Sequence, residues 1–444
     1  MKKYLMLAAI TGFIFGACNL PSRDEGEPAP PEAATPTRIT SPLSPSPTGG
    51  SDPEDDPAPM RPFPQHTRYA PDSILPNHRS QAQLDDDVRR FYDYWKSEYL
   101  IEAGVGENGV TMYRIAFGKS EEAQATTVSE GQGYGMLIVV HMAGYDPEAQ
   151  AIFDGLWEFV RAHPSEIDPR LMDWNVPLPE GNASAFDGDA DIALGLALAD
   201  AQWGSAGAVD YQAAAERVIA GILASTIGPD SRLPMLGDWV DADGDMYNQY
   251  TPRGSDFMLA NFRGYAALNG DPVWEEVIVQ SQLAVLAIQE HASPETGLIP
   301  DFIVRVDGAY QPAPPNFLEN STDGAYNYNA GRVPWRIGLD ALLYADPVSR
   351  GIAQKISHWI QAAAGNDPAN IRAGYELDGT PLPNSDYFTT FFVAPMGIAA
   401  MTDPAQQDWL NAIYDSVYDM HEDYYEDSVN LLCLLVMTGN AWGR

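Results

Sequence analysis

Lysine, arginine and cysteine are scarce in this sequence. Its 444 residues include 25 Lys and Arg against 62 Asp and Glu, which gives a formal net charge of −37. Because phosphate binding requires clustered Lys and Arg, we expect no binding to nucleic acid or to anionic lipid headgroups. The two cysteines cannot form a disulfide framework. The acidic charge excludes these partners without naming a function.

Motifs for metal binding and for activated nucleophiles are also missing. The seven histidines are scattered without metal-ligand spacing, and there is no Gly-x-Ser-x-Gly elbow and no phosphate loop. The acidic run 241–245 resembles the start of a calcium loop, but Pro252 stands where an EF-hand has its bidentate Glu. We therefore expect no metal and no cofactor.

The first eighteen residues have the pattern of an export signal. Lys2 and Lys3 precede an apolar run, 4–15, which is too short to span a bilayer comfortably. The run ends in Phe-Gly-Ala-Cys, which resembles a bacterial lipoprotein processing site. We predict a lipoprotein-type signal peptide over 1–18 with lipidation of Cys18, and membrane contact only through this anchor. The protein would be exported and either lipid-anchored at the cell envelope or secreted. The alternative is an ordinary signal peptide with an incidental cysteine.

Proline is concentrated directly after this signal. Residues 21–70 contain 13 of the 36 prolines and almost no large apolar side chains. Such a segment cannot bury a core, so we predict a disordered linker over 19–70. Residues 71–444 hold most of the apolar and acidic side chains, and we expect them to form one folded catalytic domain.

The folded part has the apolar periodicity of successive helices. Helices are predicted near 84–100, 130–145, 147–163, 187–203, 210–226, 256–268, 272–291, 331–345, 348–364, 387–401, 404–420 and 427–440. Four Asp-Pro pairs, at 146, 271, 346 and 403, precede odd-numbered helices, where Asp can cap and Pro fits the first position. Even-numbered helices follow long connections rich in Gly and aromatic residues. This alternation predicts an all-α fold, an (α/α)6 barrel of six inner and six outer helices.

Three of these long connections are the expected place for a site, since binding residues gather on loops held by a scaffold. The first, 127–136, places Glu130 among three glycines, which we expect to allow close approach of a ligand. The alternative is a Ser129-Glu130 helix cap. The second, 185–203, begins with Asp187, Asp189 and Asp191. Here the alternatives are helix capping with a solvated first turn, or calcium binding.

The third connection, 314–338, contains Glu319 and a stretch dense in aromatic, amide and Arg side chains. At these three places the sequence resembles glycoside hydrolase family 8, which contains inverting endoglucanases, lichenases, xylanases and chitosanases. The Ser-Glu-Gly-Gln-Gly-Tyr-Gly-Met block at 129–136 and the run 187–203 carry the resemblance, which extends over about 80–440. The Leu-Met-Asp-Trp segment at 171–174 and the Arg-Gly-Ser-Asp-Phe-Met segment at 253–258 add to it. The family fold is also an (α/α)6 barrel.

The resemblance implies roles for individual residues. Glu130 matches the general acid, and Asp187 matches the Asp that holds the sugar in the minus-one subsite. Many members have an Asp as general base at the start of helix eight, where this chain has Asn329. It is similar to a subfamily that instead uses a Glu of the preceding loop, and Glu319 matches that base. Asp323 is a nearer but less well-matched alternative.

An inverting glycosidase needs a protonated acid and an ionised base about 6.5–9.5 Å apart, with water between the base and the sugar. The pKa of Glu130 must therefore be raised, by burial or by a neighbouring carboxylate such as Asp187. Six further residues are expected to bind substrate beside Asn329. Four are aromatic and could either stack on sugars or fill the core: Tyr134, Trp174, Tyr328 and Trp335. The other two, Arg253 and Asp256, could either bind sugar hydroxyls or pair with each other.

We therefore predict a monomeric, endo-acting inverting hydrolase of a β-1,4-linked glucan, either cellulose-like or mixed-linkage, with a polysaccharide as its partner. A chitosanase of the same family is one alternative, because an acidic cleft would suit a cationic polymer. A non-catalytic glycan-binding lipoprotein on the same barrel is another. The presence of both Glu130 and Glu319 argues against the second alternative.

Overall fold

The computed structural model of the chain describes residues 58–177 and 182–444. The predicted signal peptide with Cys18, and most of the predicted linker, lie outside the described residues. The compact unit is Pro59–Arg444, so it begins earlier than the predicted boundary at 71. The Met60 N–H donates to the Gln202 carbonyl, and the Phe63 side chain is buried. The expectation that 59–70 belong to the linker is therefore wrong, because this segment packs on the barrel.

All twelve predicted helices are present. The even-numbered ones are α3 (Ser129–Met142), α5 (Phe186–Trp203), α7 (Leu259–Asn269), α9 (Val333–Tyr344), α11 (Thr390–Ala400) and α13 (Tyr424–Met437). The odd-numbered ones are α1 (Gln81–Tyr99), α4 (Ala149–Ala162), α6 (Tyr211–Ser225), α8 (Val273–His291), α10 (Pro347–Ala363) and α12 (Gln407–Val417). One short helix, α2 (Glu121–Gln124), was not predicted.

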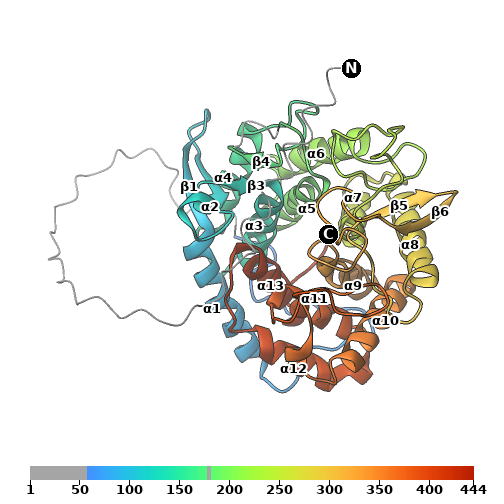
Figure 1. The fold of residues 1–444 in the computed structure, drawn as a ribbon. Helices are drawn as coiled ribbons and strands as arrows, with labels where there is room; N and C mark the ends of the chain where they lie inside the picture. Colours follow the sequence, from blue (N-terminus) through green and yellow to red (C-terminus); the bar gives the residue numbers. More distant parts are fainter. Residues whose placement is uncertain (1–57, 178–181) are drawn as a thin grey trace, which may run out of the picture. The chain divides into compact units, whose positions relative to one another are not determined.

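The two sets of helices form two rings. Each helix of the first set contacts the next in chain order, and α13 contacts α3, which closes the inner ring. Every residue of α11 is buried, whereas α10 buries only one stripe, as expected for an inner and an outer helix. In Figure 1 the outer helices α1, α8 and α12 lie at the rim, and α5, α9 and α13 lie nearer the centre. The predicted (α/α)6 barrel is thereby confirmed.

The Asp-Pro pairs act close to the predicted helix starts. Asp346 caps α10 by accepting the N–H groups of Val348 and Ser349, with Pro347 at the first helical position. Asp403 caps a short 3-10 helix, η5 (Pro404–Gln406), that leads into α12. Asp146 and Asp271 bind backbone N–H groups just before α4 and α8. These local bonds explain why the outer helices start so sharply.

In the described part of the chain, three small two-stranded sheets lie between the helices. They pair β1 (Leu100–Val105) with β2 (Thr111–Ile115), β3 (Thr127–Val128) with β4 (Asn175–Val176), and β5 (Ile303–Val306) with β6 (Ala309–Pro312), all antiparallel. Three further 3-10 helices are η2 (Gly254–Asp256), η3 (Ala330–Arg332) and η4 (Pro368–Asn370). Within the described ranges, no helix is long and apolar enough to span a membrane.

The connections before inner helices converge at one end of the barrel. Glu130 and Asp187 lie in the first turns of α3 and α5, and Arg332 ends the 3-10 helix that leads into α9. Their side chains are joined by hydrogen bonds, as described below. Helix N-termini carry a partial positive charge, so this end of the inner ring favours carboxylates.

Candidate active site

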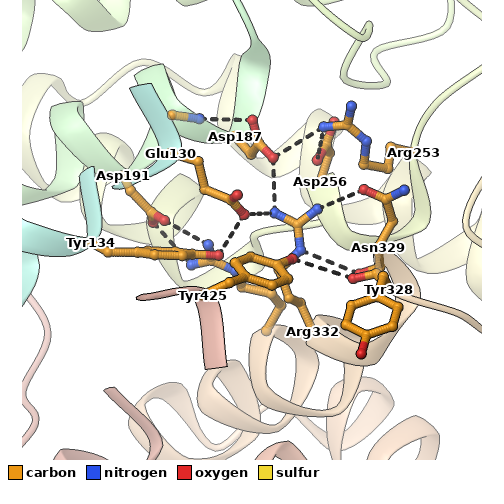
Figure 2. A network of polar contacts seen from close by, with 12 residues as sticks. Glu130, Tyr134, Asp187, Asp191, Arg253, Asp256, Tyr328, Asn329, Arg332 and Tyr425 are labelled. Atoms are coloured by element: carbon orange, nitrogen blue, oxygen red, sulfur yellow. Dashed lines mark hydrogen bonds and ion pairs between the residues drawn. The ribbon is translucent and has the colours of Figure 1, made fainter. Parts of the chain in front are cut away.

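Glu130 is held at the start of α3 by two donors. The Tyr134 hydroxyl, one turn later, donates to Glu130 Oε1 at 2.6 Å, and the Arg332 guanidinium donates to the same oxygen (Figure 2). The Glu130 side chain is 18% exposed. Burial raises the pKa of Glu130, and the negative charge of Asp187 raises it further. Arg332 and Tyr134 lower it, but the net effect is an increase. Glu130 is therefore a carboxyl group that retains its proton to higher pH than an ordinary Glu.

The glycines around Glu130 serve helix packing. A Cβ on Gly188 would lie 2.2 Å from Ser129 Oγ, and one on Gly133 would lie 2.7 Å from Asp191 Cβ. A Cβ on Gly131 would lie 2.8 Å from the Tyr424 hydroxyl. These glycines let α3, α5 and α13 approach closely. The expectation that the glycines of 127–136 make room for a ligand is therefore wrong at Gly131 and Gly133, which face protein atoms.

Asp187 lies between two guanidinium groups. Its Oδ2 accepts from Arg332 at 2.8 Å and from Arg253 at 3.0 Å, while Oδ1 accepts the Gly188 N–H at 3.0 Å. Burial alone would raise the pKa of Asp187, but Arg253 and Arg332 outweigh it and lower the pKa to about 2. Asp187 is thus an ionised carboxylate at neutral pH.

The other two carboxylates of α5 have separate structural partners. Asp189 accepts the Met172 N–H at 2.8 Å, and Asp191 pairs with Arg336 through bonds of 2.9 and 2.6 Å. Both are fully buried, which rules out the solvated first turn. No group of three His, Cys, Asp or Glu side chains in the described part of the chain could hold a metal ion. The calcium alternative therefore has no support in this geometry.

Arg332 connects the two sides of the site, a role that sequence reasoning missed. Besides Glu130 and Asp187, its guanidinium donates to the side-chain oxygen of Asn329 at 3.1 Å and to the Asn329 carbonyl at 3.3 Å. Its side chain is 2% exposed. A planar guanidinium suits such a junction because its donors point in fixed directions. The only sequence signal was its place three residues after Asn329 in a polar, aromatic-rich motif.

Glu319 lies on the far side of Asn329 from Arg332. The Asn329 amide donates to Glu319 Oε2 at 2.9 Å, and Arg253 Nη2 lies 3.7 Å from Glu319 Oε1. The side chain is 25% exposed. Burial raises the pKa of Glu319 more than Arg253 and Asn329 lower it, and Asp323 adds to the increase. A chain of hydrogen bonds therefore runs from Glu130 through Arg332 and Asn329 to Glu319.

Asp323, the alternative base, is directed into its own loop. Its carboxylate accepts the backbone N–H groups of Leu318, Glu319 and Asn320, at 2.7, 3.0 and 2.9 Å. The side chain is fully buried. A fully buried carboxylate that accepts three backbone N–H groups of its own loop in this way shapes the chain and is not exposed to a catalytic water molecule.

Arg253 and Asp256 pair with each other at the end of η2. Arg253 Nη1 lies 3.7 Å from Asp256 Oδ1, and the Asp256 side chain is fully buried. Burial raises the pKa of Asp256 to about 7 despite the Arg253 charge. Among the described residues, neither carboxyl oxygen of Asp256 has a hydrogen-bond partner. The expectation that Asp256 binds sugar hydroxyls is therefore wrong for this geometry, and the alternative pairing with Arg253 holds.

The four predicted stacking aromatics divide into two pairs. Tyr134 and Trp335 are buried, with ring centroids 6.0 Å apart, and Arg336 lies 3.9 Å over the Trp335 ring. Their expected stacking on sugars is wrong, because protein covers both rings. Trp174 and Tyr328 are only half-buried, and Tyr328 stacks on Phe391 at 5.2 Å. These two keep ring surface at which a ligand could be bound.

The arrangement places two partly exposed carboxyl groups, Glu130 and Glu319, on either side of an Arg–Asn bridge. Asp187 stays ionised, whereas the neighbouring Glu130 holds its proton more tightly than an ordinary Glu does. Environments that push the pKa values of neighbouring groups apart are typical of acid–base pairs. The site can therefore donate a proton at Glu130 while Glu319, once ionised, accepts one.

Comparison with known proteins gives a consistent result. The chain matches Glycosyl hydrolases family 8 over residues 80–439, a range that contains every site residue above. A beta-glucanase of Niallia circulans is 40% identical over 390 residues, covering 87% of this chain and 92% of that protein. An endoglucanase of Bacillus sp. (strain KSM-330) is 39% identical over 391 residues, covering 86% and 82%. The apo structure of a β-1,3-1,4-glucanase from Paenibacillus sp. X4, 40% identical, has a TM-score of 0.83 and covers 87% of this chain and 100% of that one.

Proposed function

The chain belongs to family 8 of the glycosyl hydrolases and is a glycosidase, and we propose that it is an endo-acting, inverting hydrolase of β-1,4-linked glucan. Two relatives about 40% identical over most of their length are a beta-glucanase and an endoglucanase, and a third of known structure is a β-1,3-1,4-glucanase. These names favour cellulose-like or mixed-linkage glucan as the substrate. They also weigh against the chitosanase alternative, since none of the three is named for chitosan.

In the proposed mechanism Glu130 is the general acid. It gives its proton to the leaving oxygen as the glycosidic bond breaks, and Asp187 holds the sugar on the other side of the bond. The observation that carries this assignment is the pKa contrast between the two neighbours, raised for Glu130 and lowered to about 2 for Asp187. Surroundings that push the pKa values of two neighbouring carboxyl groups apart favour a division of roles between them.

Glu319 is the proposed general base. Its carboxylate accepts a proton from water, which attacks the anomeric carbon from the face opposite the leaving group and inverts the configuration. The partial exposure of Glu319 and its separation from Glu130 by Arg332 and Asn329 support this role. Asn329 cannot accept a proton in place of the Asp that many members have, but its amide orients Glu319 and it remains a proposed substrate contact.

A panel of polysaccharides tests the substrate assignment. We expect reducing ends to be released from lichenan and carboxymethyl cellulose, and little from xylan or chitosan. The fall in viscosity should precede most of the reducing-end release, as it does for an endo-acting enzyme. Faster release from chitosan or xylan would overturn the assignment to β-glucan, while a lag in viscosity loss would overturn the endo mode.

We also propose that the protein is exported and carries lipid on Cys18, on the basis of the apolar run and the small residues before that cysteine. Cells expressing the full chain should incorporate labelled fatty acid into it, and Cys18→Ala should abolish the label. Equal labelling of both forms would refute lipidation at this residue.

A further inference from the structure

We propose that Asp323 and Tyr247 are positioning residues that fix the loop 313–320 and thereby aim the Glu319 carboxylate. This inference rests on the proposed function, in which Glu319 is the base. Unlike Glu130, Glu319 lies on no helix or strand. A base that must hold one water molecule against a sugar needs a fixed position, and a shift of 1 Å can reduce turnover about 100-fold.

Asp323 holds the loop from inside. Its Oδ2 accepts the N–H groups of Leu318 and Glu319, and its Oδ1 accepts that of Asn320. Three successive N–H groups that converge on one carboxylate form an anion-binding concavity. Asp323 is itself fixed, because its carbonyl accepts the Phe302 N–H at 2.9 Å next to β5. The backbone of Glu319 is therefore tied through one residue, Asp323, to Phe302, which directly precedes β5.

The bend of the loop depends on Asn316. The Asn316 N–H donates to the Asn320 carbonyl at 2.8 Å, and Asn316 has a φ of 59°. Asn tolerates this left-handed conformation better than most residues. The tight bend leaves the N–H groups of 318–320 pointing inward, where a carboxylate can accept them all.

Tyr247 holds the loop from outside the main core. Its hydroxyl donates to the Phe317 carbonyl at 2.8 Å, and its ring meets the Phe317 ring edge-on at 5.1 Å. On its other side the Trp239 ring is 5.3 Å away. Phe317 itself is buried in a small apolar cluster separate from the main core. The cluster consists of Met235, Leu236, Val240, Phe302, Ala313 and Phe317. The residue two positions before Glu319 is thus anchored through both its backbone and its ring.

The charge of Asp323 gives this positioning role a distinctive signature. Arg253 and Arg332 lower the pKa of Glu319, whereas Asp323 raises it, and the buried Asp301 also interacts electrostatically with Glu319. Asp323→Asn would remove one negative charge and turn an NH2 group toward backbone donors. Turnover should then fall while the pKa of Glu319 also falls.

The main test compares Asp323→Asn and Tyr247→Phe with two control variants in the same region. Asp323→Asn should lower kcat about 100-fold with KM changed less than about 3-fold, and should move the acid limb of the kcat/KM profile to lower pH. Tyr247→Phe should lower kcat about 5-fold to 10-fold, as loss of one hydrogen bond implies, without moving that limb. The controls, Asp245→Asn and Tyr250→Phe, should keep wild-type kcat. Wild-type kcat in both test variants would overturn the proposal.

Rescue by azide separates this proposal from the base assignment itself. Azide is already anionic, so it attacks the anomeric carbon without a base, forming a C–N bond as the glycosidic C–O bond breaks and Glu130 protonates the leaving oxygen. Azide should therefore restore turnover in Glu319→Gly, with an α-glycosyl azide as product, but not in Asp323→Gly. Rescue of Asp323→Gly alone would make Asp323 the base and refute both proposals.

The remaining outcomes are also separable. If azide rescues Glu319→Gly while Asp323→Asn and Tyr247→Phe turn over normally, the base assignment stands and the positioning role fails. Far-UV circular dichroism and melting temperature would show whether each variant is folded. If Asp323→Asn does not fold, the folded Tyr247→Phe variant tests the proposal on its own. A wild-type kcat in Tyr247→Phe would then overturn the proposal.

Discussion

The two proposed catalytic carboxyl groups are held by different kinds of structure. Glu130 lies in the first turn of α3, which packs closely on α5 within the main hydrophobic core. Glu319 lies in a loop over a second, smaller cluster that includes Phe317. The acid is thus fixed by the packing that stabilises the whole barrel, whereas the base is fixed by a local set of contacts. We therefore expect that the acid and the base can be disturbed separately by substitution.

The largest effect should come from the acid itself. Glu130→Gln keeps the shape of the side chain and the Tyr134 contact but removes the proton that is donated, so kcat should fall about 10²-fold to 10⁴-fold. Binding of a cello-oligosaccharide, measured by calorimetry, should stay within about 3-fold of wild type, because the Asp187 side of the site is unchanged. Loss of binding together with kcat would mean that Glu130 holds the substrate and would contradict its role as the general acid.

The contrast in packing gives an intermediate effect. Gly188→Ala places a Cβ against Ser129, so it should lower the unfolding free energy by about 1–3 kcal/mol and reduce kcat as α3 shifts. Phe317→Ala should reduce kcat about 10-fold to 100-fold through the Glu319 loop but lower the melting temperature less than Gly188→Ala does, because the Phe317 cluster is separate from the main core. Melting curves and kcat values of Gly188→Ala and Phe317→Ala check these two expectations. Equal losses of melting temperature would show that the main core and the Phe317 cluster unfold as one cooperative unit.

The smallest effect concerns Asp256, which pairs with Arg253, the same guanidinium that lies near Asp187 and Glu319. Its pKa in the folded protein, about 7, lies above the ordinary value of 3.8, so the folded state binds this proton more tightly than the unfolded state. The stability it contributes is complete below about pH 4 and is lost as the pH rises through 7. The melting temperature of wild type minus that of Asp256→Asn should therefore decrease from pH 4 to pH 8. A difference that is constant with pH would contradict the raised pKa of Asp256. The exposed Asp241 provides the control variant, Asp241→Asn.

The sequence predicted the twelve barrel helices because their signals are local. Apolar periodicity marks the outer helices, and a cap such as Asp346 needs only the next few residues. Residues 59–70 were misassigned because their stabilising contacts are with distant carbonyls, such as that of Gln202. A proline-rich composition cannot reveal those partners.

The candidate site was predictable in its positions but not in its contacts. The motif around Glu130 and the loop containing Glu319 marked the right places, although their catalytic roles stay predictions. Inner helices are buried on most sides, so apolar periodicity cannot tell which face lines the barrel. For that reason Trp335 was expected to face a ligand, and the burial of Asp256 and the central place of Arg332 were not foreseen.

The configuration of the first product tests most directly whether Glu130 and Glu319 form an inverting acid–base pair. A ¹H NMR spectrum recorded within the first minutes of hydrolysis of a β-glucan oligosaccharide, before mutarotation, shows which anomer is released. We predict that the α-anomer appears first and that the β-anomer grows in only as the sugar equilibrates. Initial release of the β-anomer would require a retaining mechanism with an enzyme nucleophile and would contradict the assignment of Glu319 as a base acting on water.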